Sequence, residues 1–275
     1  MSLKDILVHL DTTDKGRNVS DFAVSLATEF GAHLTAAGVV IEITPPASFM
    51  GEFPYDLMVQ AAEQARDAAN VSFKSLQSAV PASVGTDLVI IDSVAGQARE
   101  EFGRLARHFD LTVVGQGGPD SGSDDELMAE GALFRSGRPV FVVPYIHKGA
   151  AKLGKAMVAW DGGLAAARTV ADALPLLKRA GRVEVVSIAV KGLPVDELPG
   201  FNITRHLSRH GISATLKKLP AAENIGAALL SHAADAGADY LVMGGYGHSR
   251  LREFVLGGAT RSIFESMTIP VFMSH

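Results

Sequence analysis

Apolar runs that stop at an acid open both halves of the chain. Residues 4–11 read KDILVHLD and residues 154–161 read GKAMVAWD, so each run ends at an aspartate. Because their apolar residues are nearly continuous, both runs are typical of strands buried in a parallel sheet. A helical pattern follows each run, at 18–30 and at 165–180, and then a second apolar run. Both halves therefore begin as a strand–helix–strand unit.

The ends of the two halves also match. Residues 108–118, HFDLTVVGQGG, correspond to residues 237–247, GADYLVMGGYG. Residues 137–145, GRPVFVVPY, correspond to residues 268–275, TIPVFMSH. In each half we expect five strands that alternate with four helices. This alternation predicts an α/β fold of two tandem, doubly wound domains, each with a five-stranded parallel sheet and right-handed crossovers.

The boundary between the halves lies in a stretch of small and polar residues, 145–154. It separates the last strand of one half from the first strand of the next. We therefore predict one domain over residues 1–147 and a second over residues 152–275.

The first domain carries an insertion. The offset between matching positions falls from 150 (Asp11 to Asp161) to 129 (Asp110 to Asp239), which leaves about 20 additional residues in the first half. They lie around residues 45–80, in a pattern that predicts a Pro-rich loop and a long amphipathic helix. We expect this helix to pack on its own sheet, and a role in interaction with a partner is the alternative.

Composition narrows the function classes. The hydrophobic fraction is 47% and the charged fraction 20%, as in globular proteins. The net charge of −5 argues against broad nucleic-acid binding. The absence of cysteine excludes disulfides, thiolate metal sites and cysteine nucleophiles. No apolar run reaches the roughly 18 residues of a membrane helix, and the first residues do not resemble a signal peptide, so we expect a soluble, cytoplasmic protein.

The glycine-rich stretch 244–262, GGYGHSRLREFVLGGATRS, is the main candidate for chemistry. It fails the dinucleotide fingerprint, the Walker A loop and the nucleophile elbow at one position or more. The nine histidines form no metal-binding pattern, and His206 and His210, four residues apart, lack a third ligand. We therefore predict no catalytic residue and no metal site.

The stretch does fit a phosphate-binding connection. Gly244 ends an apolar run at the carboxyl edge of a sheet, where open α/β folds bind ligands. A helix is predicted from Ala259 to Met267, and a helix N-terminus offers free N–H groups and partial positive charge to phosphate. His248 and Arg250, with Arg252 beyond them, add basic side chains. A glycine-rich connection whose cations face solvent is the alternative.

These residues and the tandem layout resemble the universal stress protein family. Nucleotide-binding members of that family carry G-x-x-G, nine residues, then G-S/T. Gly244, Gly247 and Gly257 have this spacing, whereas Gly258 stands where the family has Ser or Thr, and Thr260 matches a second hydroxyl position. The resemblance covers essentially all 275 residues as two copies. It implies a Rossmann-like fold of the adenine nucleotide alpha hydrolase type, with the two domains related by a pseudo-two-fold axis as an internal pseudo-dimer through their last strands.

The resemblance also implies a nucleotide site in the second domain. Asp161 would meet the adenosine end, with the Ile188 backbone nearby, although a helix N-cap or turn acid is the alternative for Asp161. The residues implied for the remainder of the site and its phosphates are Met243, Gly244, Gly247, His248, Arg250, Gly257, Gly258, Ala259 and Thr260. The implied ligand is ATP, with Mg²⁺ as a companion ion. AMP, ADP or no nucleotide are the alternatives.

The first copy has lost this pattern. Gly115 and Gly118 keep the first spacing, but twelve residues then precede Gly131, and Ala132 follows it. Five acids replace the basic residues: Asp120, Asp124, Asp125, Glu126 and Glu130. Carboxylates near a phosphate site repel it, so we predict that the first domain binds no ATP in the family's manner. A divalent-cation site in this acidic segment is the alternative to a solvated loop, and Asp11 leaves another small ligand open.

Three functions follow from the resemblance. The first is a stress-response protein that binds an adenine nucleotide and is regulatory or protective, with slow ATP hydrolysis at most. The second is an interaction protein of the same fold that binds no nucleotide and acts through dimerisation, including a homodimer of the chain. The third is an adenylyl-transferring or amide-forming enzyme, for which the sequence offers no catalytic residues.

Overall fold

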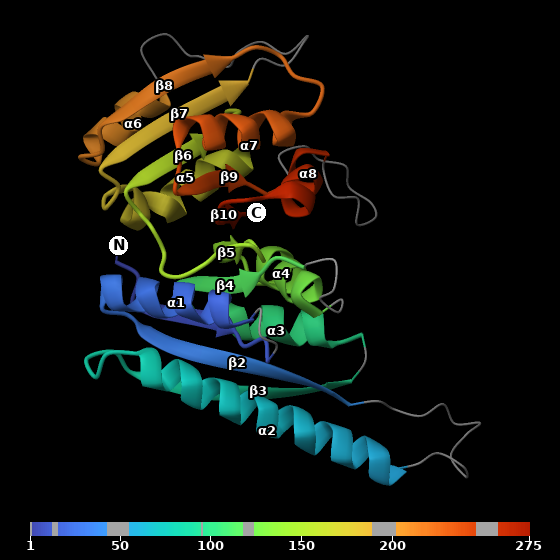
Figure 1. The fold of residues 1–275 in the computed structure, drawn as a ribbon. Helices are drawn as coiled ribbons and strands as arrows, with labels where there is room; N and C mark the ends of the chain where they lie inside the picture. Colours follow the sequence, from blue (N-terminus) through green and yellow to red (C-terminus); the bar gives the residue numbers. More distant parts are fainter. Residues whose placement is uncertain are drawn as a thin grey trace. The chain divides into compact units, whose positions relative to one another are not determined.

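The computed structural model describes residues 2–12, 16–42, 55–94, 96–117, 124–188, 202–245 and 258–275. The chain divides into two compact units, Leu3–Ala151 and Lys152–His275. Each unit contains a parallel sheet with helices on both of its faces (Figure 1).

The first unit alternates strands and helices. In chain order its elements are β1 (Asp5–His9), α1 (Gly16–Phe30), β2 (His33–Glu42), α2 (Tyr55–Ala79), β3 (Thr86–Val94), α3 (Ala98–Ala106), β4 (Leu111–Gly115), α4 (Asp124–Arg135) and β5 (Val140–Val143). The strands are all parallel and lie in the order β3-β2-β1-β4-β5. Helices α1 and α2 cover one face of the sheet, and α3 and α4 cover the other.

The second unit repeats this plan. Its elements are β6 (Lys155–Ala159), α5 (Leu164–Leu177), β7 (Arg182–Ile188), α6 (Ile203–Arg209), β8 (Ala214–Leu219), α7 (Ile225–Ala236), β9 (Tyr240–Gly244), α8 (Gly258–Ser266) and β10 (Val271–Ser274). The parallel strands lie in the order β8-β7-β6-β9-β10. The predicted fold class, two tandem doubly wound units with five parallel strands each, is confirmed.

Continuous apolar runs form the core strands because both faces of each sheet are covered. Ile6, Leu7 and Val8 of β1 are fully buried. On α1, apolar residues recur at helical spacing, and Phe22 meets Phe141 of β5 edge to face with ring centroids 5.0 Å apart. Such buried aromatic pairs stabilise a core beyond the area that they bury.

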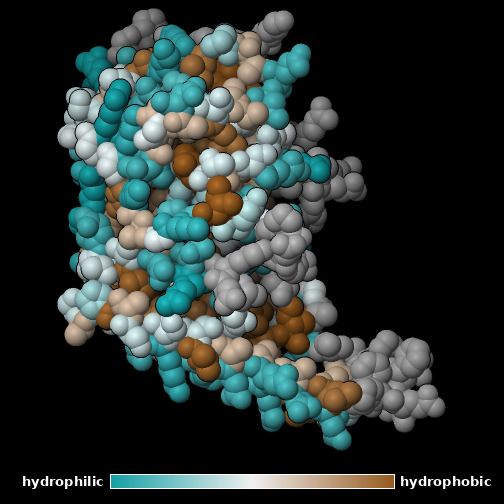
Figure 2. Space-filling view, viewed as in Figure 1, coloured by the Kyte–Doolittle hydropathy of each residue, from teal (hydrophilic) through white to brown (hydrophobic). Residues whose placement is uncertain are grey.

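Helix α2 contains much of the insertion of the first half. It packs on β2 and β3 through a narrow stripe that includes the buried Ala69 and Leu76. Arg66 of α2 also forms an ion pair of 2.5 Å with Asp92 of β3. Its outer surface carries exposed apolar side chains such as Leu57 and Val71, and Figure 2 shows apolar side chains among hydrophilic ones over this helix. None of the helices in the described ranges is long and apolar enough to cross a lipid bilayer.

An aspartate fixes the amino edge of each sheet at matching positions. Asp110 Oδ2 accepts hydrogen bonds from the backbone N–H groups of Lys4, at 2.8 Å, and Asp5, at 3.2 Å. In the second unit Asp239 Oδ2 accepts one from the N–H of Lys155 at 2.7 Å. Each aspartate precedes one central strand and holds the start of its neighbour, so the repeat preserves strand register as well as strand order.

Asp5 is a partly buried acid at the amino edge of the first unit. Its Oδ1 is buried and has no hydrogen-bond partner among the described residues. Burial raises the pKa of Asp5 above its ordinary value of 3.8; His33 opposes this shift, and the charges of Asp110 and Asp87 add to it. The ionised form is therefore disfavoured in the folded state, so Asp5 reduces stability progressively as the pH rises through its raised pKa.

Replacing Asp5 with asparagine should therefore stabilise the protein at pH 7, by no more than about 1 kcal/mol because solvent screens the neighbouring charges. The advantage over the wild type should shrink as the pH falls towards 3.8, where the wild-type carboxyl is protonated. Urea unfolding between pH 4 and pH 7 would measure it. A variant less stable than the wild type at pH 7 would contradict this assignment.

Candidate functional site

At the carboxyl edge of the second sheet, the ends of β7, β6 and β9 lie side by side. Strand β6 pairs with β7 on one side, where Ala159 lies opposite Val186, and with β9 on the other, where Val158 lies opposite Val242. The chain runs outward from β6 to β7 and β8, then returns to the opposite side of β6 as β9. This is the point at which open α/β sheets bind ligands, because the flanking connections diverge there.

Asp161 lies at this edge, just beyond the end of β6. Trp160 extends the strand by donating its backbone N–H to Val186 O at 2.8 Å. Asp161 is exposed, and its Oδ1 accepts a hydrogen bond from the N–H of Gly163 at 2.8 Å. The N-cap of α5 is Gly163 itself, so Asp161 is a turn acid and not an N-cap. Its Oδ2 accepts no hydrogen bond from the residues that the structure describes.

Gly244 has a packing role that the sequence did not reveal. A Cβ atom at this position would lie 2.6 Å from Ala166 N and 2.7 Å from Ala165 C, both in the first turn of α5. The end of β9 therefore approaches the α5 backbone too closely for any side chain. Met243 is buried beside it, and Ile188 ends β7 half-buried.

The first turn of α8 contains Gly258, Ala259 and Thr260. A Cβ atom at Gly258 would meet nothing within 4 Å, so this glycine is not required by packing. Thr260 is only 3% exposed, so its side chain points into the protein. Gly226 of α7 fits against Ala259 O, 2.7 Å from where a Cβ would lie, and this close contact fixes α8 on α7.

Four predicted site residues, Gly247, His248, Arg250 and Gly257, lie outside the described residues. The last described residue before them, Gly245, is held by β10. Its N–H donates to Ser274 O at 2.9 Å, and its carbonyl accepts a hydrogen bond from His275 Nδ1 at 3.1 Å. A carbonyl can only accept, so His275 carries its proton on Nδ1 in this contact. Sequence patterns gave no signal for His275, because the contact depends on where β10 ends beside β9.

The corresponding edge of the first unit contains a buried polar pair. His9, the last residue of β1, is 6% exposed, and Asp125, in the first turn of α4, is 8% exposed. His9 Nδ1 lies 3.2 Å from Asp125 Oδ1 as an ion-pair contact that is not aligned as a hydrogen bond. Phe102 packs edge-on against the imidazole, with ring centroids 5.6 Å apart. Side chains of the chain itself therefore occupy the space beside β1 and β4.

One sequence assignment in this region was wrong. Gly131, taken as the counterpart of Gly257, lies inside α4 and not in a loop. Its carbonyl O lies 2.7 Å from where a Cβ of Gly103 in α3 would stand, so the two glycines let these helices approach closely. Both connections begin with the same G-x-x-G spacing, and this spacing did not indicate that α4 starts closer to its preceding strand than α8 does.

The acids of this segment also differ from the expected solvated loop. Asp125 is buried against His9, and Glu130 pairs with Arg99 at 3.1 Å. Asp120 lies outside the described residues, as does most of the segment considered for a divalent cation. The described part of the chain contains no group of three or more His, Asp or Glu side chains that could hold a metal ion.

Comparison with known proteins identifies the fold. No protein-family model matches the chain, and no curated protein sequence matches it. A universal stress protein from Archaeoglobus fulgidus is similar in structure, with a TM-score of 0.73 and 16% identity over 98% of this chain and 97% of that one. A Pseudomonas aeruginosa protein of unknown function is also similar, with a TM-score of 0.57 and 15% identity over 99% of this chain and 92% of that one.

A third similar structure is a Pseudomonas aeruginosa protein described as a candidate universal stress protein. Its TM-score is 0.56 at 16% identity, over 99% of this chain and 93% of that one. All three matches extend over both units, so they cover the two successive copies of the fold and not one copy alone. The resemblance in the sequence is thereby confirmed at the level of structure: the chain has the fold of the universal stress proteins in tandem form.

Proposed function

We propose that the second unit binds an adenine nucleotide, with ATP as the first ligand to test, at the carboxyl edge between β6 and β9. The observation that carries this proposal is the convergence at the switch point. Ile188 and Gly244 end β7 and β9 there, Asp161 lies two residues beyond the end of β6 between them, and the connection that leaves Gly244 leads to the start of α8. The role of such binding is regulatory or protective in a cytoplasmic stress response, with slow hydrolysis at most.

The phosphates would lie against the start of α8 in this arrangement. Backbone N–H groups at Gly258 and Ala259 belong to the first turn, where no intrahelical acceptor is available. The glycines and the basic side chains of His248 and Arg250 precede that turn in the sequence. Together with the helix dipole these groups favour a polyphosphate, for which Mg²⁺ is a suitable companion ion.

The first unit is not expected to bind a second nucleotide. His9 and Asp125 fill the corresponding edge, and the buried carboxylate would repel a phosphate. We therefore expect one nucleotide per chain, bound by the second unit.

A second candidate function, that of an interaction protein without nucleotide, is favoured by two residues. Gly258 lacks the hydroxyl that accompanies the motif, and the Thr260 side chain is buried in α8.

Titration of Mg·ATP onto the full chain separates the two candidates. The single tryptophan, Trp160, adjoins Asp161 and supplies a fluorescence signal. Saturable binding that is lost in a Gly247→Val/Gly257→Val variant supports the nucleotide site, and no saturation at millimolar nucleotide refutes it.

Gly258→Ser should tighten nucleotide binding. The position has room for a side chain, and the new hydroxyl adds one hydrogen bond to phosphate. One such bond contributes about 0.5–1.5 kcal/mol, which corresponds to about 2- to 13-fold in Kd. Isothermal titration would measure the change, with Gly258→Ala as the matched control that adds a Cβ without the hydroxyl. Equal affinities for the serine and alanine variants would show that no phosphate contacts this position.

A further inference from the structure

Four arginines gather where α3 and α4 end in the first unit. Arg104 lies in the last turn of α3, Arg107 is the C-cap of that helix, and Arg135 ends α4. Arg138 follows three residues after α4 ends. We call these four residues the arginine cluster. Arg104, Arg107 and Arg138 are exposed, and Arg135 is partly exposed.

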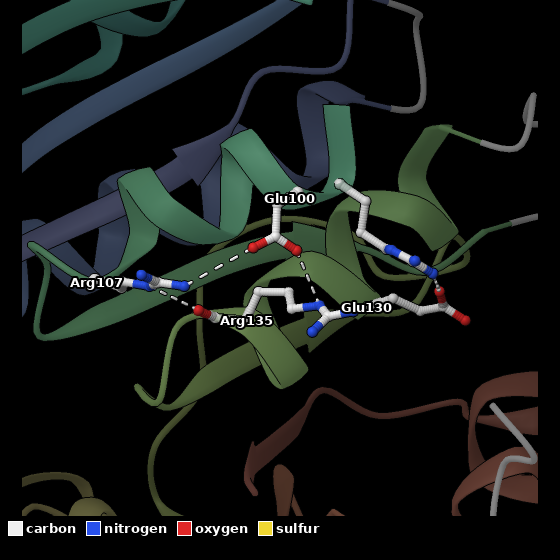
Figure 3. Close-up of polar contacts among 5 residues, drawn as sticks. Glu100, Arg107, Glu130 and Arg135 are labelled. Carbon is white, nitrogen blue, oxygen red and sulfur yellow. Dashed lines mark hydrogen bonds and ion pairs between the residues drawn. The ribbon is translucent and has the colours of Figure 1, made fainter. Parts of the chain in front are cut away.

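Backbone contacts tie three members of the cluster, Arg107, Arg135 and Arg138, to one another. Arg107 Nε donates to Arg135 O at 2.9 Å, and Arg138 Nε donates to Arg107 O at 3.2 Å. Figure 3 shows Arg107 and Arg135 both turned towards Glu100. The Arg135 Nε to Glu100 Oε2 distance is 3.1 Å, whereas the Arg107 Nη2 to Glu100 Oε1 distance is 4.0 Å. One carboxylate is thus shared by two guanidinium groups of the cluster.

The charges in this region do not balance. Glu100 and Glu101 of α3 supply two negative charges, and the two helix C-termini supply about half a charge each. Against four arginines this leaves an excess of about one positive charge. The neighbouring Asp110 is already directed at the backbone N–H groups of Lys4 and Asp5, and Glu130 is paired with Arg99. A net positive surface therefore stands on a chain whose overall charge is −5.

The fold does not require these arginines. The second unit has the same helix ends, yet no arginine lies near the end of α7, where Asp235 and Asp239 flank the C-cap Gly237. In α8 the only arginine, Arg261, pairs with Glu265 one turn later. Helix termination can thus be achieved without the cluster, and its charge is a property of the first unit alone.

We propose that the arginine cluster docks an acidic segment of a partner protein, one that carries several carboxylates in succession. The arginines are exposed, and an exposed ion pair is individually weak, so a lone carboxylate or phosphate would not be held. Several carboxylates in one segment add their contributions and are steered to the surface. A long nucleic acid would extend past the cluster onto a negatively charged chain, whereas a short acidic segment stays within the screening length of about 8–10 Å.

The test uses a fluorescein-labelled peptide of ten glutamates and the full chain at low ionic strength, read by fluorescence anisotropy. Saturable binding is expected, and Arg107→Gln/Arg138→Gln should weaken it by about tenfold, as the loss of two exposed contacts implies. Arg107→Lys/Arg138→Lys should retain most of the affinity, because it keeps the charges and removes only the Nε contacts. Glu100→Gln should tighten binding, since it releases Arg107 and Arg135 from their internal partner.

The control is Arg17→Gln/Arg209→Gln, which removes the same charge from exposed positions on other helices. Three results would overturn the proposal: no saturation with wild-type protein, an equal loss of affinity in the control, or equal affinity for a single-stranded DNA of ten nucleotides. Weaker binding by Glu100→Gln would be a fourth such result, and that variant leaves all four arginines in place. None of these outcomes bears on the nucleotide site of the second unit.

Discussion

Replacing His9 with alanine should lower the free energy of unfolding of the first unit by about 2–5 kcal/mol, the usual cost of truncating a large buried side chain. The pair is nearly inaccessible, with His9 6% and Asp125 8% exposed. Without the imidazole, the Asp125 carboxylate stays in a low-dielectric environment with its partner gone. Hydrogen exchange of the β1 and β4 amides would measure the loss, because these strands belong to the first unit.

The control for this prediction is a double-mutant cycle with Asp125→Ala. If the pair is coupled, His9→Ala should destabilise the unit far less when Asp125 is already alanine. Equal effects of His9→Ala in both backgrounds would contradict the pairing. A loss below about 1 kcal/mol in the wild-type background would show that the site resembles an exposed pair.

Gly244→Ala should destabilise the second unit by about 1–3 kcal/mol, the usual cost of overpacking. Its new Cβ would lie 2.6–2.9 Å from Ala166 N, Ala165 C and Ala165 Cβ, two of which are backbone atoms that cannot move alone. Either β9 or α5 must shift, which also moves Asp161 relative to Gly245 at the proposed site. Nucleotide affinity should therefore fall together with the stability measured by urea unfolding.

Gly258→Ala is the matched control, because a Cβ at that position meets nothing within 4 Å. It should leave the stability of the second unit close to that of the wild type. If Gly244→Ala were equally harmless, the close approach of β9 to α5 would not exist in solution. If it lost affinity without losing stability, Gly244 would contact the ligand and not the helix.

The fold was predictable because two kinds of sequence information agreed. The nearly continuous apolar runs that became β1 and β6 mark strands covered on both faces, and the internal repeat tested each assignment against a second copy. The matched aspartates Asp110 and Asp239, first noticed only for their spacing, hold the starts of neighbouring strands in both units. A pattern that occurs twice for one physical reason is a reliable guide to topology.

The site was less predictable, because glycines serve several purposes that one sequence cannot distinguish. Gly131 has the spacing of a loop glycine but lies in α4, and Gly244 lies at the predicted edge but serves helix packing. The His9–Asp125 pair joins residues 116 positions apart (125 − 9). Periodicity describes local structure, so it could not indicate that pair or the contact between His275 and Gly245.

The two units have the same fold but differ in the residues at the edges of their sheets. The second unit presents glycines and a turn acid at its carboxyl edge, whereas the first closes that edge with His9 and Asp125. The first unit instead concentrates positive charge at the opposite ends of its helices. Under our proposals, one unit senses a nucleotide and the other contacts a partner.

Native mass spectrometry of the full chain with Mg·ATP tests the central claim most directly, because it counts ligands. Our account predicts one nucleotide per chain in the wild type and none in the Gly247→Val/Gly257→Val variant. The His9→Ala variant should still bind one nucleotide, since its site lies in the second unit. Two nucleotides per chain, or none at millimolar ATP, would contradict the account.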